Sequence, residues 1–396
     1  MSMNEQMKES EESILHTYNR FPVVFEKGQG CYLYDSEGKE YLDFAAGIAV
    51  NSLGYHYPGY DEALKDQIDK LMHISNLYYN EPIIEAGAKL VKASKMSKAF
   101  FTNSGTEAIE GALKAAKKYA YVRDGHADHE IIAMNHSFHG RSIGALSVTG
   151  TAHYREPFEP LMGGVKFADF NDLESVKAQI TDKTCAIITE VVQGEGGIYP
   201  AKKEFLEGLR QICDEKDIML IFDEIQCGMG RTGHYFAWQA YGVQPDIMTS
   251  AKALGCGVPV GAFVLNEKAA KASLEPGDHG TTYGGNPFVC AAVSKVFDIY
   301  KNDKIIEHVQ EMTPYLEQKL DEIVAKHECA ATRRGMGFMQ GIVIQDRPVG
   351  EVVKAALAKG LLVISAGSDV LRIVPPLVIT KEHIDKMAAI LDECME

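Results

Sequence analysis

Short apolar runs that alternate with helical stretches constrain the fold of this chain most strongly. The runs 184–192 (TCAIITEVV) and 218–224 (IMLIFDE) lack the apolar–polar alternation of a strand with one solvated face, and a helical stretch, 203–216, separates them. Strands of this kind occur in parallel sheets that helices cover on both faces. The sequence therefore predicts an α/β fold with a mostly parallel central sheet.

The same alternation begins near residue 60 and divides the chain into three parts. The N-terminal part, 1–59, contains two short strands around a turn within 30–44 and is expected to pack with a small domain. Strands and helices alternate through 60–284, which we predict to be the large domain. From 285 to 396 two helical stretches precede short alternating strands and helices, which indicates a smaller α+β domain.

Composition excludes several classes of partner. The 396 residues carry a net charge of −15, which argues against binding to nucleic acid or an anionic membrane. The sequence contains no run of 18 apolar residues and no basic, apolar leader at its start. Its 8 cysteines stand singly, without a CxxC pair, which fits a reducing compartment. We expect a cytoplasmic protein without a membrane span.

Polar residues follow four of the predicted strands, and the first group is FTNSGTEA at 101–108. Residues 103–106 link a strand to a helix, so free backbone N–H groups and the positive end of a helix dipole point at one place. That arrangement suits a phosphate. The simpler interpretation is a helix N-cap with Glu107 in the first turn, and taken alone it is the favoured one.

The second strand end carries Asp223 and Glu224 directly after the most apolar run of the chain. An acid at the end of a buried strand is costly unless it is paired, so it marks a functional carboxylate, a helix cap or a structural ion pair. A G-x-G-x-x-G pattern follows at Gly228, Gly230 and Gly233. Because it does not lie in the first tight turn after the strand, we do not interpret it as a dinucleotide site.

The third strand end, NHSFHGRSIGALS at 135–147, holds Phe138, His139 and Arg141. His136 and His139 have the i, i+3 spacing of some metal ligands, but no nearby carboxylate or thiol completes a set. We therefore expect no metal and assign structural or stacking roles to both histidines.

Lys252 follows the fourth strand, 247–250, and precedes a stretch of glycines and other small residues. A lysine, a buried acid, a phosphate cradle and an aromatic ring together describe a site for pyridoxal phosphate, because a lysine amine can bind the cofactor aldehyde covalently. Asp223 would keep the pyridine nitrogen protonated, so that the ring can accept electrons from the substrate.

Seven motifs, in the expected order, resemble the class III pyridoxal-phosphate-dependent aminotransferases. The resemblance extends from residue 21 to the end of the chain. It implies a fold-type I transferase with a mostly parallel sheet in its large domain, pyridoxal phosphate as cofactor, and a homodimer as the minimal active unit. The motifs are FFTNSGTEAIEGALKAA, SFHGRSIGALSVTG, EVVQGEGGIYP, IFDEIQCGMGRTG, PDIMTSAKALGCGVPVGA, HGTTYGGNP and VLRIVPPL.

The resemblance also implies which residues contact the cofactor. Lys252 would hold it covalently and move a proton of the substrate, and Asp223 would pair with the pyridine nitrogen. The other implied contacts are with the phosphate, the ring face and the ring hydroxyl, and they come from Ser104, Gly105, Thr106, Phe138, Gln226 and, from the neighbouring subunit, Thr282.

Within the family the motifs are nearest to members that convert N-acetylornithine, with 2-oxoglutarate as acceptor and glutamate as product. By that resemblance Arg141, with Thr281 nearby, binds the carboxylate of the acylated ornithine, and Arg372 binds that of glutamate. A bare Arg372 would favour the wrong amine, so Glu195 is expected to cover it and to swing away for glutamate. A plain turn residue is the alternative for Glu195. Tyr18 would line the acyl end of the pocket.

Several alternatives remain open at this stage. Ornithine δ-, succinylornithine and 4-aminobutyrate aminotransferases share the same core motifs. A ligand-binding regulator on the same fold would usually add a DNA-binding arm and lose the lysine or the aspartate, and neither change is present in the sequence. A nicotinamide dehydrogenase would have to use the glycine pattern at 228–233.

Overall fold

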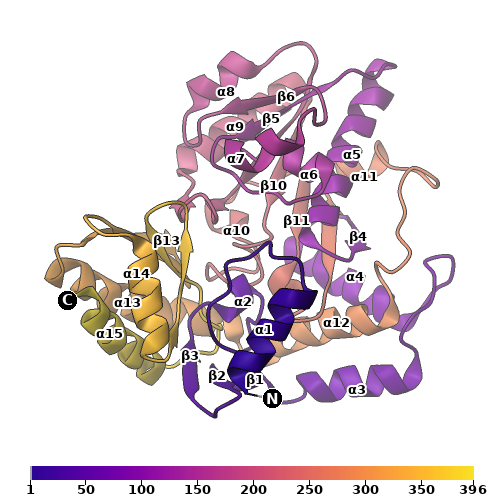
Figure 1. The fold of residues 1–396 in the computed structure, drawn as a ribbon. Coiled ribbons are helices and arrows are strands. Elements are labelled where there is room, and N and C mark those ends of the chain that lie inside the picture. Colours follow the sequence, from indigo (N-terminus) through magenta and orange to yellow (C-terminus); the bar gives the residue numbers. More distant parts are fainter. Residues whose placement is uncertain (1) are drawn as a thin grey trace.

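The structure is a computed structural model that describes residues 2–396 (Figure 1). Its central sheet has seven strands in the order β4-β12-β11-β10-β7-β5-β6. Neighbouring strands from β11 to β6 are parallel, and β12 is antiparallel to both of its neighbours. The α/β prediction with a mostly parallel sheet is confirmed. The strands are β4 (Lys98–Thr102), β5 (Glu130–Met134), β6 (Val165–Ala168), β7 (Thr184–Glu190), β10 (Met219–Asp223), β11 (Ile247–Ser250) and β12 (Gly261–Leu265).

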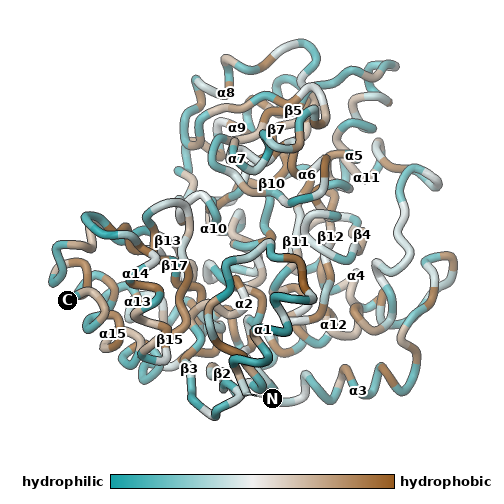
Figure 2. Tube along the Cα trace, viewed as in Figure 1, coloured by the Kyte–Doolittle hydropathy of each residue, from teal (hydrophilic) through white to brown (hydrophobic). Residues whose placement is uncertain are grey.

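Helices cover both faces of this sheet, which explains why its strands lack polar alternation. Along β10, Met219 and Ile221 pack in one buried cluster with residues of α5, and Leu220 and Phe222 pack in the other with residues of α9. In Figure 2 the strands near β5 and β7 have the hydrophobic colour, whereas the outer helix α1 is largely hydrophilic. The helices around the sheet are α5 (Gly105–Asp124), α6 (Ile143–Ser147), α7 (Ala152–Arg155), α8 (Leu173–Gln179), α9 (Lys203–Lys216), α10 (Trp238–Tyr241) and α11 (Glu267–Lys271).

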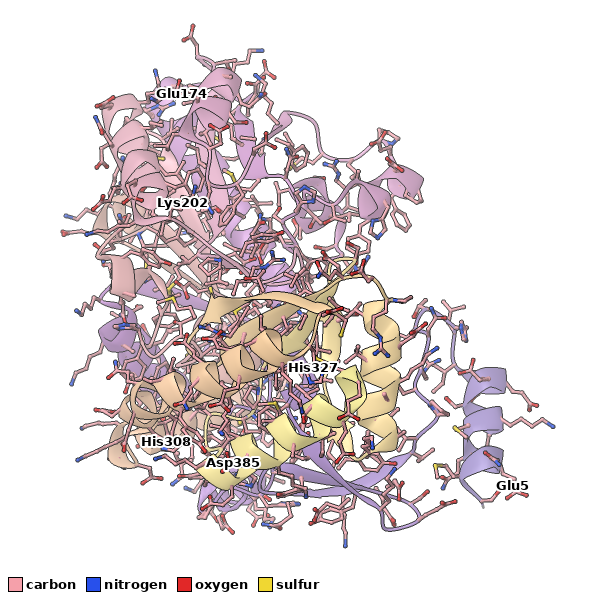
Figure 3. All side chains as sticks on the ribbon, turned by 90° about the vertical axis from the view of Figure 1, so that its left-hand side faces the viewer. Glu5, Glu174, Lys202, His308, His327 and Asp385 are labelled. Atoms are coloured by element: carbon pink, nitrogen blue, oxygen red, sulfur yellow. The ribbon has the colours of Figure 1, made fainter. Side chains whose placement is uncertain are left out.

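The C-terminal part forms a second layered unit. An antiparallel sheet in the order β13-β14-β17-β16 packs with α13, α14 and α15, and Figure 3 shows α13 and α15 side by side, with His308 and Asp385 labelled on them. The elements are α13 (Ile305–Lys326), β13 (Ala330–Met336), β14 (Met339–Ile344), α14 (Val349–Ala358), β15 (Leu361–Leu362), β16 (Ile364–Ala366), β17 (Val370–Ile373) and α15 (Lys381–Met395). The preceding helix, α12 (Pro287–Asn302), packs mainly against α3 (Tyr60–Lys70) and α4 (Glu81–Ser94).

The N-terminal strands join this C-terminal unit through one parallel pairing. A four-stranded sheet has the order β1-β2-β3-β15, in which Leu42 of β3 lies opposite Leu361 of β15. The domain boundaries themselves stay a prediction. The remaining elements are α1 (Met3–Ser13), β1 (Phe25–Gln29), β2 (Tyr32–Asp35), β3 (Glu40–Asp43), α2 (Ala46–Ala49), η1 (Glu156–Phe158), β8 (Val192–Gln193), β9 (Tyr199–Pro200) and η2 (Lys252–Leu254).

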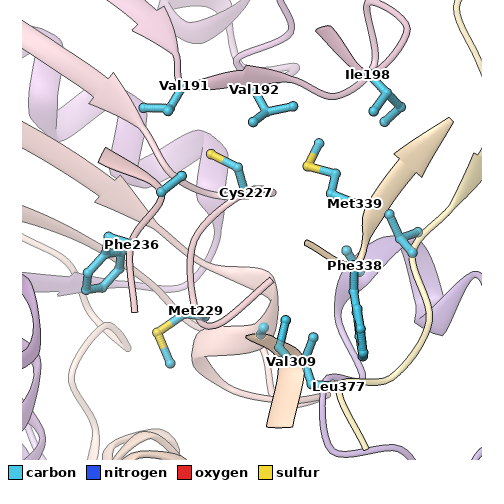
Figure 4. Close-up of a cluster of buried hydrophobic side chains, with 14 of the residues drawn as sticks. Val191, Val192, Ile198, Cys227, Met229, Phe236, Val309, Phe338, Met339 and Leu377 are labelled. Carbon is cyan, nitrogen blue, oxygen red and sulfur yellow. The ribbon is translucent and has the colours of Figure 1, made fainter. Parts of the chain in front are cut away.

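The loop with the G-x-G-x-x-G pattern is a packing element. It runs from the end of β10 to α10 and buries Cys227 and Met229 against Phe338 and Leu377 of the C-terminal part (Figure 4). Gly230 has a φ of +83°, and a Cβ there would lie 2.8 Å from a methyl group of Leu377. The glycine therefore permits a left-handed turn and a close approach between chain segments.

Candidate active site

The C-terminal ends of β4, β5, β10 and β11 meet at one edge of the central sheet. This follows from the topology, because two successive antiparallel pairings through β12 leave β4 parallel to β11. A cavity of about 430 Å³ lies there, where open α/β sheets bind their ligands. Its lining includes Asn103, Ser104, Gly105, Thr106, Phe138, His139, Arg141, Asp223, Gln226 and Lys252.

Lys252 begins the short turn η2 directly behind β11 and lines this cavity. Its φ of +49° is unusual for a residue with a side chain, a kind of strain that clusters at functional sites. Burial lowers the pKa of the Lys252 amine, and Arg372 lowers it further, while Glu195 and Asp223 oppose the shift. The amine is therefore easier to deprotonate than that of an exposed lysine, as a nucleophile requires.

Asp223 ends β10 and is held by three hydrogen bonds. Its Oδ1 accepts from the backbone N–H of Ile225 at 3.0 Å and from the hydroxyl of Thr249 at 3.1 Å, and its Oδ2 lies 2.7 Å from Nδ1 of His139. Because an ionised carboxylate only accepts hydrogen bonds, Nδ1 of His139 donates. Contact with Asp223 is a role of His139 that the sequence did not predict.

His136 and His139 do not form a pair. His136 is exposed, whereas His139 is buried with its side chain against Asp223. Among residues 2–396 a different set, Asp124, His126 and His129, could surround an ion. There, however, the guanidinium of Arg123 already binds both carboxylate oxygens of Asp124, each at 2.6 Å.

The start of α5 offers backbone donors to the cavity. Ser104 is the N-cap, and its hydroxyl accepts the N–H of Glu107 at 3.3 Å, so the N-cap interpretation holds for this residue. Within residues 2–396 no acceptor is found for the N–H groups of Gly105 and Thr106. A Cβ at Gly105 would lie 2.9 Å from the side chain of Ile225, so a larger residue at this position would require Ile225 to move. A helix start with free donors is suited to an anion.

Two further buried carboxylates lie near the site, and sequence reasoning missed the first. Glu190 ends β7, lines the cavity, and accepts the N–H groups of Phe138 and Gly194 at 3.2 and 3.0 Å. Burial raises its pKa to about 7. Glu224 accepts the N–H groups of Ala237 and Trp238, both at 2.8 Å, which is a capping role at α10.

Arg372 of β17 and Glu195 form a bidentate ion pair next to the cavity. Nη1 and Nη2 of Arg372 lie 2.5 and 3.2 Å from the two carboxylate oxygens of Glu195. Gln226, which lines the cavity, accepts from Arg372 at 3.0 Å and donates to Glu195 at 3.3 Å. Burial raises the pKa of Glu195, but its contacts with Arg372 outweigh this and hold the pKa below its usual value. The structure thus brings together two residues 177 positions apart in sequence.

The glycines around Glu195 are required by close packing. A Cβ at Gly194 would lie 2.5 Å from Gln226, and one at Gly196 would lie 2.5 Å from the carbonyl oxygen of His136. The carbonyl oxygen of Glu195 also accepts the N–H of Gly367 at 2.8 Å. The backbone around Glu195 is closely packed, so a displacement of the carboxylate from Arg372 would come most simply from rotation of the side chain.

Besides Glu195 and Arg372, which lie next to the cavity, three sequence-predicted residues lie outside its lining. The side chain of Tyr18 is 72% exposed, and Thr282 is exposed as well. Thr281 is tied to the start of α5, because its hydroxyl accepts a hydrogen bond from the amide of Asn103 at 3.2 Å. Their predicted roles stay predictions.

The comparisons with known proteins agree with this geometry. The model of the family described as "Aminotransferase class-III" matches residues 14–395. The chain belongs to the class III aminotransferases. It is 47% identical to an acetylornithine aminotransferase of Clostridium acetobutylicum, over 98% of this chain and 100% of that protein. It is 48% identical to one of Methanocaldococcus jannaschii, over 96% and 95% of the two chains.

A solved structure supports the fold of this class III aminotransferase. The ornithine aminotransferase of Toxoplasma gondii superimposes with a TM-score of 0.95 at 28% identity, over 100% of this chain and 94% of that one. That structure holds pyridoxal phosphate at partial occupancy in its active site. The protein is therefore a transaminase on a fold-type I scaffold, and its family implies pyridoxal phosphate.

Proposed function

We propose that the protein transfers the terminal amino group of N-acetyl-L-ornithine to 2-oxoglutarate, giving N-acetyl-L-glutamate 5-semialdehyde and L-glutamate. The observation that carries this proposal is the bidentate pair of Arg372 and Glu195 beside Lys252. Such a pair can hide a carboxylate-binding arginine while a terminal amine reacts, and can expose it for glutamate. The two acetylornithine aminotransferases described above support the choice of substrate.

The residues of the cavity fit pyridoxal phosphate. Lys252 supplies the amine for covalent attachment, and the free N–H groups of Gly105 and Thr106 suit the phosphate. Asp223 suits the pyridine nitrogen, Phe138 the ring face and Gln226 the ring hydroxyl. When bound, the cofactor supplies an electron sink for the electrons released at the substrate carbon.

Residues of the chain itself move the substrate proton and select between the two amino donors. With the cofactor bound, Lys252 would remove the proton from the substrate carbon that bears the amine and pass it to the cofactor carbon that takes up the amino group, because its lowered pKa favours the neutral amine. Rotation of Glu195 away from Arg372 would free that guanidinium for the α-carboxylate of glutamate or 2-oxoglutarate. Because the amino donor and the acceptor then use the same site one after the other, we expect ping-pong kinetics.

The other end of the long donor would meet Arg141. This residue lines the cavity, and no carboxylate of residues 2–396 pairs with its guanidinium. An acylated ornithine offers a carboxylate for Arg141 and an amide that needs no cationic pocket. Thr281 would lie near that carboxylate, and Tyr18 would contact the acyl group.

Initial rates with four donors test the substrate. With 2-oxoglutarate as acceptor, kcat/KM should be highest for N-acetylornithine and lower by about tenfold or more for ornithine and 4-aminobutyrate, because a site shaped for one set of polar groups rejects donors that leave them unpaired. N-Succinylornithine is the fourth donor and reports on the acyl pocket. A preference for ornithine or 4-aminobutyrate would refute the proposed substrate.

A homodimer is the second part of the proposed function. Large apolar side chains are exposed on the segment that joins α3 to α4, among them Leu77 at 86% and Tyr79 at 96%. This segment lies beside exposed Tyr283 and Thr282, since Asn76 donates a hydrogen bond to the carbonyl oxygen of Gly284 at 2.8 Å. An apolar face of this kind suits a protein partner. A second copy would cover it and bring Thr282 to the partner's phosphate site.

Sedimentation equilibrium tests the dimer. The wild-type protein should sediment as two copies of the 43.5 kDa chain, and Tyr79→Asp should shift it toward monomers that retain less cofactor, because a charge would be buried at the interface. Tyr121→Asp, at an exposed position on α5, is the matched control. A wild-type monomer with full cofactor occupancy would rule out the cross-subunit role of Thr282.

The cysteines support the proposed cytoplasmic location. All eight are free thiols, and all but Cys329 are buried. Buried single thiols suit a reducing compartment. Separately, no helix among residues 2–396 has the length and apolar character needed to cross a bilayer.

A further inference from the structure

We propose that Tyr154 is a positioning residue for the donor substrate: its ring holds the guanidinium of Arg141 over the mouth of the cavity. This inference rests on the proposed function, in which Arg141 binds the carboxylate of the acylated ornithine. Tyr154 lies on α7, in a segment that none of the sequence motifs covers.

The three side chains form a stack at the cavity. The guanidinium carbon of Arg141 lies 4.0 Å from the centroid of the Tyr154 ring and 5.3 Å from that of Phe138. The two rings meet edge to face, with centroids 6.0 Å apart and an interplanar angle of 81°. A guanidinium within about 6 Å of a ring centroid is attracted by the face of the ring. Arg141 is therefore oriented by two aromatic rings.

The two rings are the only partners of the Arg141 guanidinium found among residues 2–396. Among residues 2–396 its guanidinium forms neither a hydrogen bond nor an ion pair, and the residue is exposed. A long, exposed arginine without such contacts would sample many rotamers, which costs free energy when a ligand fixes one of them. The contact with the Tyr154 ring lowers this free-energy cost, because it restricts the rotamers of Arg141 before the ligand binds. It also leaves the N–H groups at the edge of the guanidinium free to donate to a carboxylate.

Contacts on both sides of Tyr154 tie its helix to neighbouring elements. Gly150, just before α7, donates its N–H to the carbonyl oxygen of Ser137 at 3.1 Å, and a Cβ there would lie 2.0 Å from the carbonyl oxygen of Met134. On the other side the guanidinium of Arg155 lies 4.0 Å from the ring of Phe167 on β6. The helix α7 is thus tied both to the loop that carries Phe138 and to the sheet.

Kinetics of the purified holoenzyme separate positioning from a merely structural role. In Tyr154→Leu the KM for N-acetylornithine should rise about threefold to fivefold, which corresponds to the loss of one exposed cation–π contact, while kcat changes little. The kcat/KM for 2-oxoglutarate should stay unchanged, because Arg372 binds that substrate. Tyr154→Phe keeps the ring face and should behave as wild type. Tyr121→Leu replaces an exposed tyrosine at the far end of α5 and is the matched control.

Calorimetry supplies a readout without turnover. N-Acetyl-L-norvaline keeps the carboxylate and the acyl amide of the donor but lacks the transferable amine, and its Kd should rise in Tyr154→Leu by the same factor. An unchanged KM and Kd, or an equal loss with 2-oxoglutarate, would overturn the role of Tyr154. A wild-type enzyme that does not turn over N-acetylornithine would instead refute the proposed function, and the variants would then be compared on the carboxylate-bearing donor that it does accept.

Discussion

Lys252→Ala lowers the transaminase rate by about 10³-fold or more, because the variant loses both the covalent attachment of the cofactor and the base that moves the substrate proton. The measurement is kcat with N-acetylornithine and 2-oxoglutarate under saturating pyridoxal phosphate. The absorbance band of the covalently bound cofactor should be absent from the same sample.

The control for this variant is Lys271→Ala. Lys271 is an exposed lysine of α11 that pairs with Glu267, so its loss should leave both the rate and the absorbance unchanged. Turnover of Lys252→Ala near the wild-type rate would contradict the assignment. The strained backbone of Lys252 and the burial of its amine would then need another explanation.

Glu195→Ala changes which donor reacts with the enzyme. Without the carboxylate, Arg372 stays buried, and its remaining hydrogen-bond partners among residues 2–396 are neutral, namely Gln226 and the carbonyl oxygen of Ser365. It should then bind the α-carboxylate of glutamate without displacing an internal carboxylate. The half-reaction rate with glutamate, divided by that with N-acetylornithine, should rise about tenfold to a hundredfold. Breaking the buried ion pair leaves the charge of Arg372 uncompensated, and the carboxylate of glutamate can compensate it.

Stopped-flow absorbance of the cofactor measures the two half-reactions separately. Glu195→Gln keeps the shape and hydrogen-bonding capacity but not the charge, so it should fall between wild type and Glu195→Ala. Glu207→Ala, on the exposed side of α9, controls for the loss of a surface carboxylate. Equal half-reaction rates in Glu195→Ala and wild type would exclude Glu195 as the gate.

The sequence was sufficient to predict a mostly parallel central sheet and the candidate functional residues at four of its strand ends. The apolar runs of β7 and β10 reveal burial on both faces, and parallel strands bring their ends to one edge, so Ser104, Asp223 and Lys252 could be placed in one site. The antiparallel strand β12 did not affect this prediction. It is antiparallel to both β11 and β4, so β4 runs in the same direction as β11.

Contacts between distant segments could not be predicted in the same way. The hydrogen bond between His139 and Asp223 joins residues 84 positions apart, and nothing local to His139 signals it. Glu190 and Tyr154 were missed for the same reason, since their partners are fixed only when the strands and α7 are packed together. The predicted role of Tyr18 stays a prediction, because in a single chain its ring is largely exposed and is not part of the cavity lining.

The central claim is that Lys252 holds the cofactor, and one measurement tests it most directly. The protein is reconstituted with pyridoxal phosphate, the covalent bond is reduced with borohydride, and the peptides are sequenced by mass spectrometry. The predicted result is a single phosphopyridoxyl group within residues 245–265, at Lys252. A label on a different lysine, or none after complete reconstitution, would contradict the account.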